Sequence, residues 1–293
     1  MGRAKAASVG IVAALSLALA GCSSAPLAPT IVVTHVHAVD LDEERGAVYV
    51  ATHEGILRVA IDGSESDAEP ATVERLGVWE GDIMGMARLD AAIYFSGHPA
   101  PGESFPANIG LYRTDVGGQA FTPIALEGEV DFHSMTVGRA SGSSWALAGI
   151  DSASGRVIVS RDGGVTWSVG AAISARAVSW DSNADLLYAT TEEGLQVSTD
   201  DGATFAILET APPLVLITST PAGASTDAFL AGVDLEGYVH TSIDGVTWVS
   251  SGLAPPLTSA LSVGSGGSLV AAGIDGVQRS DDGGATWTVI AEF

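Results

Sequence analysis

A short polar turn that recurs along the chain constrains the fold more than any other feature. Two clear copies are SRDGGVTW, at Ser160–Trp167, and SDDGGATW, at Ser280–Trp287. Looser copies occupy Ser198–Phe205 and Thr241–Trp248, and a worn copy begins near Arg113 and closes on Phe121. Because the copies recur at intervals of about 40–50 residues, with strand-like segments between them, we expect a ring or stack of similar sheets.

Each residue type in the pattern S-x-D-x-G-x-T-W has a physical reason to be there. The aspartate carboxylate can accept hydrogen bonds from backbone N–H groups of its own turn. Glycine supplies the positive φ that a tight hairpin needs. The threonine and the tryptophan open the next strand, and the tryptophan offers one large apolar face for burial. The pattern therefore predicts a hairpin.

This repeat resembles the Asp-box, or BNR, motif of sialidase-like β-propellers. In that family the box closes the hairpin between the third and fourth strands of a blade, on the rim and away from any active site. The resemblance implies a structural role for the residues that occupy the conserved positions of the box, which are Asp162, Trp167, Asp200, Asp244, Trp248, Asp282 and Trp287.

The remaining pattern predicts an all-β fold in one domain, residues 31–293. Period-two alternation with Gly, Asp and Ser between the runs predicts short strands, which the first blade shows at His37–Asp42, Ala47–Thr52 and Gly55–Ile61, followed by a fourth near Val73–Val78. Six blades of four strands fit the sequence. Seven blades are the alternative, because the proline-containing stretch Ala211–Pro221 is difficult to assign.

The first 21 residues have the composition of an export signal. Arg3 and Lys5 precede an apolar run, Ala6–Ala20, that is too short and too rich in alanine for a membrane span. The sequence LAGC ending at Cys22 resembles a bacterial lipobox, which implies cleavage before Cys22 and a lipid on its thiol. An ordinary secretory signal is the alternative. Residues 22–30 would form a tether, and the protein would be anchored to the outer face of the bacterial cell membrane.

Charge and composition exclude several functions. Removing residues 1–21 takes away Arg3 and Lys5 and no acid, which leaves 10 basic and 35 acidic residues and a formal charge of −25. Lys5 is the only lysine, so the mature chain has neither a Schiff-base lysine nor a P-loop lysine. A strongly acidic domain is repelled by nucleic acid, which is not an expected partner. We expect a monomer.

Blade geometry places most histidines opposite the repeated turns. If those turns join third to fourth strands, the starts of the innermost strands and the loops joining second to third strands lie on the other face. Five of the six histidines fall at such positions in three adjacent blades, and only His240 does not. The expected ligand-binding residues are His35, His37, His53, His98 and His133.

Histidines and carboxylates on one concave face suit two chemistries. They can bind a divalent metal such as zinc or copper, for which His35, His37 and His133 are the candidate ligands. They can also serve as general acids and bases near neutral pH. The alternative is a set of separate histidines that hydrogen-bond backbone in the channel wall.

The segments around the histidines resemble a bacterial lipoprotein branch of the Asp-box superfamily whose members are labelled glycosylhydrolases. That label implies hydrolysis of a sugar bond, which needs two carboxylates, and the candidates are Glu54, Asp82 and Asp131. The arginine triad of true sialidases is not found. Two hypotheses therefore stand, a binding module for a metal, glycan or protein and a glycoside hydrolase.

Overall fold

The computed structural model describes residues 1–2, 31–61, 71–139, 145–181, 185–220 and 229–293. Contacts divide the chain into Met1–Thr30 and Ile31–Phe293, and every strand belongs to the second unit. The expected signal sequence, the tether and Cys22 lie outside the described residues. Within the described ranges, no helix has the length and apolarity needed to cross a bilayer.

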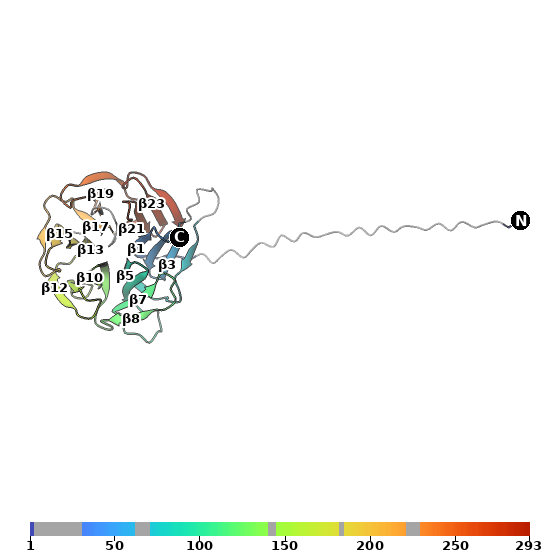
Figure 1. Cartoon of the computed structure of the whole chain (residues 1–293), viewed down its shortest axis with the longest axis horizontal. Helices are drawn as coiled ribbons and strands as arrows, with labels where there is room; N and C mark the ends of the chain where they lie inside the picture. Colours follow the sequence, from blue (N-terminus) through green and yellow to red (C-terminus); the bar gives the residue numbers. More distant parts are fainter. Residues whose placement is uncertain (3–30, 62–70, 140–144, 182–184, 221–228) are drawn as a thin grey trace. The chain divides into compact units, whose positions relative to one another are not determined.

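The unit Ile31–Phe293 is a β-propeller of six four-stranded antiparallel blades, which confirms the predicted fold (Figure 1). Each blade consists of four strands that are consecutive in the sequence. The first three blades are β1 (Val36–Asp42), β2 (Ala47–Thr52), β3 (Gly55–Ala60) and β4 (Val73–Arg75); β5 (Asp82–Leu89), β6 (Ala92–His98), β7 (Leu111–Asp115) and β8 (Thr122–Ala125); and β9 (Phe132–Arg139), β10 (Trp145–Asp151), β11 (Arg156–Ser160) and β12 (Ser168–Ala172).

The other three blades repeat this order. They are β13 (Ala177–Asp181), β14 (Leu186–Thr191), β15 (Gly194–Ser198) and β16 (Ala206–Ile207); β17 (Leu214–Ser219), β18 (Leu230–Asp234), β19 (Tyr238–Ser242) and β20 (Val249–Leu253); and β21 (Thr258–Val263), β22 (Leu269–Gly273), β23 (Gly276–Ser280) and β24 (Thr288–Glu292). The stretch that was difficult to assign contains β17, which starts directly after Pro212 and Pro213 and opens the fifth blade.

The six innermost strands contact one another around the axis in the order β1, β5, β9, β13, β17, β21 and back to β1. Each has an edge that no strand covers, and in β1, β9 and β13 hydroxyl groups of the preceding blade pair with part of this edge. The N–H of Phe132 donates to Ser96 Oγ at 3.0 Å, and the N–H of Val178 donates to Ser134 Oγ at 3.1 Å. Buried backbone donors need such partners, so these bonds help to fix the spacing of the blades.

The ring closes without a strand borrowed from the opposite terminus, because the first and last blades are each built from consecutive strands. One apolar cluster joins them and includes Val33, Val277 and Ala291, with Phe293 packed against it. Beside this cluster the Glu43 carboxylate accepts hydrogen bonds from the hydroxyl groups of Ser265 and Ser268. Packing and hydrogen bonds thus supply the closure.

The repeated turns have the predicted chemistry. In the copy at Ser160–Trp167, Asp162 Oδ1 accepts the Thr166 N–H at 2.8 Å and Asp162 Oδ2 accepts the Thr166 hydroxyl at 2.6 Å. The Thr166 hydroxyl is the main cause that lowers the pKa of Asp162 to about 2. The closing aromatic residues pack into five different clusters between blades, and they are Phe121, Trp167, Phe205, Trp248 and Trp287.

One strand ends three residues before its expected boundary. The fourth strand of the first blade was expected near Val73–Val78 but ends at Arg75. Gly77 has φ +68°, which interrupts an extended strand, and Val78 is 87% exposed. The alternation of apolar residues continued into a loop and did not reveal the end of the strand.

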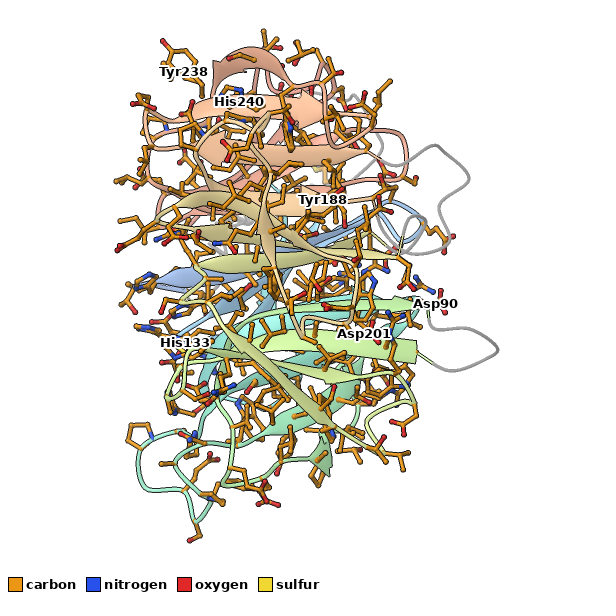
Figure 2. All side chains as sticks on the ribbon, turned by 90° about the vertical axis from the view of Figure 1, so that its left-hand side faces the viewer. Asp90, His133, Tyr188, Asp201, Tyr238 and His240 are labelled. Carbon is orange, nitrogen blue, oxygen red and sulfur yellow. The ribbon has the colours of Figure 1, made fainter. Side chains whose placement is uncertain are left out.

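The repeated turns and the histidines lie on opposite faces of the propeller. In the edge-on view of Figure 2, His133 and Asp201 are on opposite sides, and Asp201 belongs to the turn Ser198–Phe205. The antiparallel register explains this, because β2 pairs Thr52 with both Val36 and Gly55 and so brings the start of β1 and the β2–β3 turn to one end of the blade.

Candidate metal centre

Three histidines gather at one end of the first blade. His35 directly precedes β1, His37 is its second residue, and His53 lies in the two-residue turn between β2 and β3. The turn is fixed by the Thr52 side chain, which donates to the Gly55 carbonyl at 2.9 Å and accepts the Glu54 N–H at 3.0 Å. Two local elements of one blade therefore supply the whole group.

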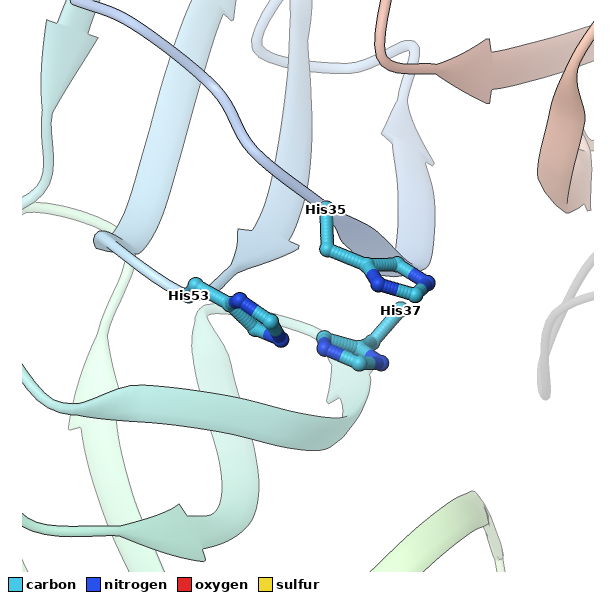
Figure 3. Close-up of side chains that lie close together, drawn as sticks. All are labelled: His35, His37 and His53. Carbon is cyan, nitrogen blue, oxygen red and sulfur yellow. The ribbon is translucent and has the colours of Figure 1, made fainter.

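The three imidazoles are close enough to share one ligand (Figure 3). His35 and His37 are stacked, with ring centroids 4.5 Å apart, and His53 lies 4.9 Å from His37 and 5.2 Å from His35. One nitrogen of each ring lies within 4.8 Å of the others. We call His35, His37 and His53 the first group.

Asp82, the first residue of β5, faces this group from the neighbouring blade. Its Oδ1 lies 3.6 Å from His37 Nε2, and its Oδ2 lies 3.7 Å from His53 Nε2. These separations exceed a hydrogen bond. Two ligand atoms bound at about 2.1 Å to one tetrahedral zinc ion lie about 3.4 Å apart, so the gaps have about the size that a shared ion requires.

A second group joins the second and third blades and consists of His98, Asp131 and His133. Asp131 precedes β9, and its nearly buried carboxylate accepts hydrogen bonds from His133 Nε2 at 2.7 Å and from Ser152 Oγ at 2.9 Å. His98, at the end of β6, holds its Nε2 3.4 Å from Asp131 Oδ2. The carboxylate thus lies between two imidazoles.

The loop after β6 sets the proton of His98. His98 Nδ1 lies 2.8 Å from the carbonyl oxygen of Ala107. A carbonyl can only accept, so Nδ1 carries a proton and Nε2 is the ring nitrogen that faces Asp131. Metal-binding histidines are oriented in the same way, by donating their other ring nitrogen to a carbonyl or a carboxylate.

Electrostatics within the face keep His37 neutral and shift the pKa values of Asp82 and Asp131 in opposite directions. Burial, followed by electrostatic repulsion from His35 and His53, lowers the pKa of His37 to about 4. Burial raises the pKa of Asp82. Burial alone would raise the pKa of Asp131 as well, but hydrogen bonds from His133 and Ser152 lower it, and the hydrogen bond to Asp131 raises the pKa of His133.

Several polar atoms of this face are buried without a partner. Among the described residues, six buried side-chain nitrogen or oxygen atoms lack a hydrogen bond, and three of them are His37 Nε2, Asp82 Oδ1 and Asp131 Oδ1. Such atoms are costly in a folded protein and call for an explanation, of which a bound ion is one. The unpaired atoms are ligand atoms of the types that a divalent transition metal prefers.

The face opens into a central cavity of about 410 Å³ that the innermost strands enclose. His35, His37 and His133 line it, so the three expected metal ligands share one cavity, although they divide between the two groups. Asp82 and Asp131 each face one group. Glu54 belongs to neither, because its carboxylate accepts the Thr34 hydroxyl at 2.6 Å and holds the segment before β1.

His240 lies apart from both groups, on β19, where its Nε2 is 2.7 Å from Asp234 Oδ2. Asp234 also accepts the N–H groups of Glu236 and Tyr238, so this pair closes the β18–β19 turn. The repeat spacing had already set His240 apart from the other histidines. The repeat spacing did not predict that the other five histidines divide into two groups.

Comparisons with known proteins agree on the fold alone. The sequence matches no protein-family model. It matches no curated protein sequence. Similar solved structures include a nidogen/laminin complex chain, with 16% identity over 84% of this chain and 93% of that one and a TM-score of 0.59.

Two further structures have comparable similarity. The GH74 xyloglucanase from Xanthomonas campestris is 18% identical over 89% of this chain, which spans 38% of the enzyme, with a TM-score of 0.55. A streptogramin B lyase is 14% identical over 90% of this chain and 85% of that one, with a TM-score of 0.53. At these identities the likeness establishes a β-propeller and assigns no activity.

Proposed function

We propose that this protein is an Asp-box propeller of the bacterial cell envelope that binds a divalent transition metal on its histidine face. The first group supplies three imidazole ligands, and Asp82 supplies a carboxylate as the fourth. Three histidines and one carboxylate form a tetrahedral donor set of the kind that zinc accepts, and copper accepts the same imidazoles.

One observation carries this proposal, namely the convergence of unpaired buried atoms on the first group. His37 Nε2 and Asp82 Oδ1 are buried, lie 3.6 Å apart and make no hydrogen bond. A structural histidine–aspartate pair is expected to close such a gap, as His133 and Asp131 do at 2.7 Å. A bound cation would satisfy both atoms and offset the cost of burying Asp82.

The proposed location rests on the sequence. The apolar run before Cys22 and the lipobox-like LAGC support export and a lipid anchor on the outer face of the membrane, and residues 22–30 would tether the propeller. The four repeated turns support membership of the Asp-box superfamily. A metal-binding propeller anchored there would retain the ion at the cell surface.

Isothermal titration of the purified full-length chain with zinc tests the proposal. The parent is expected to bind zinc, and His37→Ala is expected to weaken binding strongly because it removes the central ligand. His240→Ala is the matched control, since it removes a histidine outside both groups and should leave binding unchanged. No binding by the parent, or equal binding by the parent and His37→Ala, would contradict the proposal.

A second function, hydrolysis of a glycosidic bond, is favoured by the opposite pKa shifts of two aspartates on the histidine face. Burial raises the pKa of Asp82, as a general acid requires, whereas hydrogen bonds keep Asp131 ionised, as a base or nucleophile requires. A panel of chromogenic glycosides with the full chain, followed by Asp131→Asn and Glu54→Gln, tests it. Activity that Asp131→Asn abolishes would establish the hydrolase, and an inactive parent would count against it.

A further inference from the structure

The innermost strands carry an irregularity at the histidine end of the blades. Pairing between the two inner strands skips one residue in five of the six blades, always near the end of the second strand. A skipped residue is a β-bulge, which bends the strand and redirects a side chain. In the first three blades the skipped residues are His37, Met84 and His133.

These three bulge residues surround one opening. His37, Met84 and His133 all line the central cavity, and they come from the adjacent strands β1, β5 and β9. Strand β5 lies between the other two, and β1 and β9 also approach each other directly. On β5, Met84 therefore occupies the same bulge position that His37 and His133 occupy on the two neighbouring inner strands, which a sequence pattern does not reveal.

The cavity also gathers the other methionines of the propeller. The chain has four methionines, and the three that follow Met1 are Met84, Met86 and Met135, all of which line this cavity. A β-carbon at Gly85 would lie 3.2 Å from Cγ of Met135, so the Met135 side chain packs against β5 between the other two. Met86 and Met135 also pack in apolar clusters, whereas Met84 is only half-buried.

We propose that the histidine face also offers a second, overlapping site for copper in its Cu(I) state, bound by His37, Met84 and His133 at the mouth of the cavity. This inference rests on the proposed metal binding and adds a monovalent ion that shares His37 with the divalent one. Thioether sulfur is a soft ligand that selects Cu(I), whereas zinc binds thioethers weakly. Cys22 is the only cysteine, so no thiolate of the propeller competes for the ion.

Zinc and Cu(I) therefore use different partners of a shared ligand. Zinc takes His37 with His35, His53 and Asp82, whereas Cu(I) takes His37 with Met84 and His133. Both ions need His37, so binding of one excludes the other. We therefore expect substitutions at Met84 or His133 to weaken Cu(I) binding and a substitution at His53 to weaken zinc binding.

The test measures both affinities on the full-length chain, anaerobically, by competition with a chromogenic Cu(I) chelator and separately with a zinc chelator. Loss of even an outer-shell partner of a metal costs about 10–100-fold in affinity, so Met84→Leu should weaken Cu(I) binding at least about tenfold and leave zinc binding unchanged. Met86→Leu is the matched control, a similar change at a methionine in the inter-blade core. X-ray absorption of the Cu(I) form should show a copper–sulfur contribution that Met84→Leu removes.

The outcomes separate this inference from the proposed function. Three outcomes would overturn the copper assignment alone, provided that zinc still binds. They are no Cu(I) binding by the parent, an unchanged Cu(I) affinity in Met84→Leu, and a loss of Cu(I) affinity in Met86→Leu as large as that in Met84→Leu. Absence of binding for both ions would overturn the metal site as well. Thermal unfolding of each variant, compared with the parent, shows whether a loss of affinity is a loss of fold.

Discussion

Replacing His37 by glutamine measures how strongly the imidazoles are crowded. The pKa of His37 is lowered from an ordinary 6.5 to about 4 by burial and by the neighbouring histidines. The folded protein therefore binds fewer protons than the unfolded chain between pH 6.5 and 4, and its stability must fall as the pH drops through this window. Glutamine cannot titrate, so the variant lacks this part of the loss.

The magnitude follows from the same shift. A pKa difference of about 2.5 corresponds to about 3.4 kcal/mol at 1.36 kcal/mol per pKa unit. The His37 side chain is 12% exposed, but the His53 side chain beside it is 40% exposed, so water screens part of the repulsion. We expect about 1–2 kcal/mol after this discount. In a domain of this size that is about 2–8 °C in melting temperature.

The assay is urea or thermal unfolding of the metal-free chain in the presence of a chelator, from pH 7 to pH 4. The parent should lose about 1–2 kcal/mol more than His37→Gln over this range. His240→Gln controls for the removal of a histidine outside both groups. Parallel pH profiles for the parent and His37→Gln would show that the first group is not crowded in solution and would contradict the lowered pKa of His37.

Three other predictions concern the turns, the inner strands and the terminus. The Thr286 hydroxyl lowers the pKa of Asp282 to about 2, so the stability that the ionised Asp282 contributes is present above about pH 4 and is lost as the pH falls through about 2. The stability of Asp282→Asn should therefore depend less on pH in this range. An unchanged pH profile would count against the turn chemistry. Gly85→Ala should destabilise the chain by about 1–3 kcal/mol in urea unfolding, because its β-carbon would overlap the Phe132 carbonyl, whereas Gly266→Ala, in open space, should be neutral and equal effects would contradict this packing. Cys22→Ser should move the protein from the membrane fraction to the soluble fraction of the expressing bacterium, and an unchanged distribution would argue against the lipid anchor.

The ring and its two faces could be predicted because they depend on local rules. The aspartate and glycine of each turn fix a hairpin, and antiparallel strands alternate in direction, so a turn after a third strand and a histidine at the start of a first strand must lie on opposite faces. Six blades followed from the repeat spacing. The end of β4 did not, because Gly77 interrupts a run whose alternation continues to Val78.

The grouping within the histidine face could not be predicted, because it depends on side-chain direction. His133 was expected beside His35 and His37, yet its hydrogen bond to Asp131 draws it into the second group. Glu54 was a candidate acid, but Thr34 engages its carboxylate. Met84 carries no sequence signal for this role, since only the register of β5 against β6 reveals that it is skipped.

Anomalous diffraction from crystals of the chain grown with zinc, measured on both sides of the zinc absorption edge, tests the metal site most directly. We expect a zinc peak bounded by His35, His37, His53 and Asp82, with Asp82 Oδ1 and His37 Nε2 both within bonding distance. A face without a peak, or a peak confined to the Asp234–His240 pair, would contradict it.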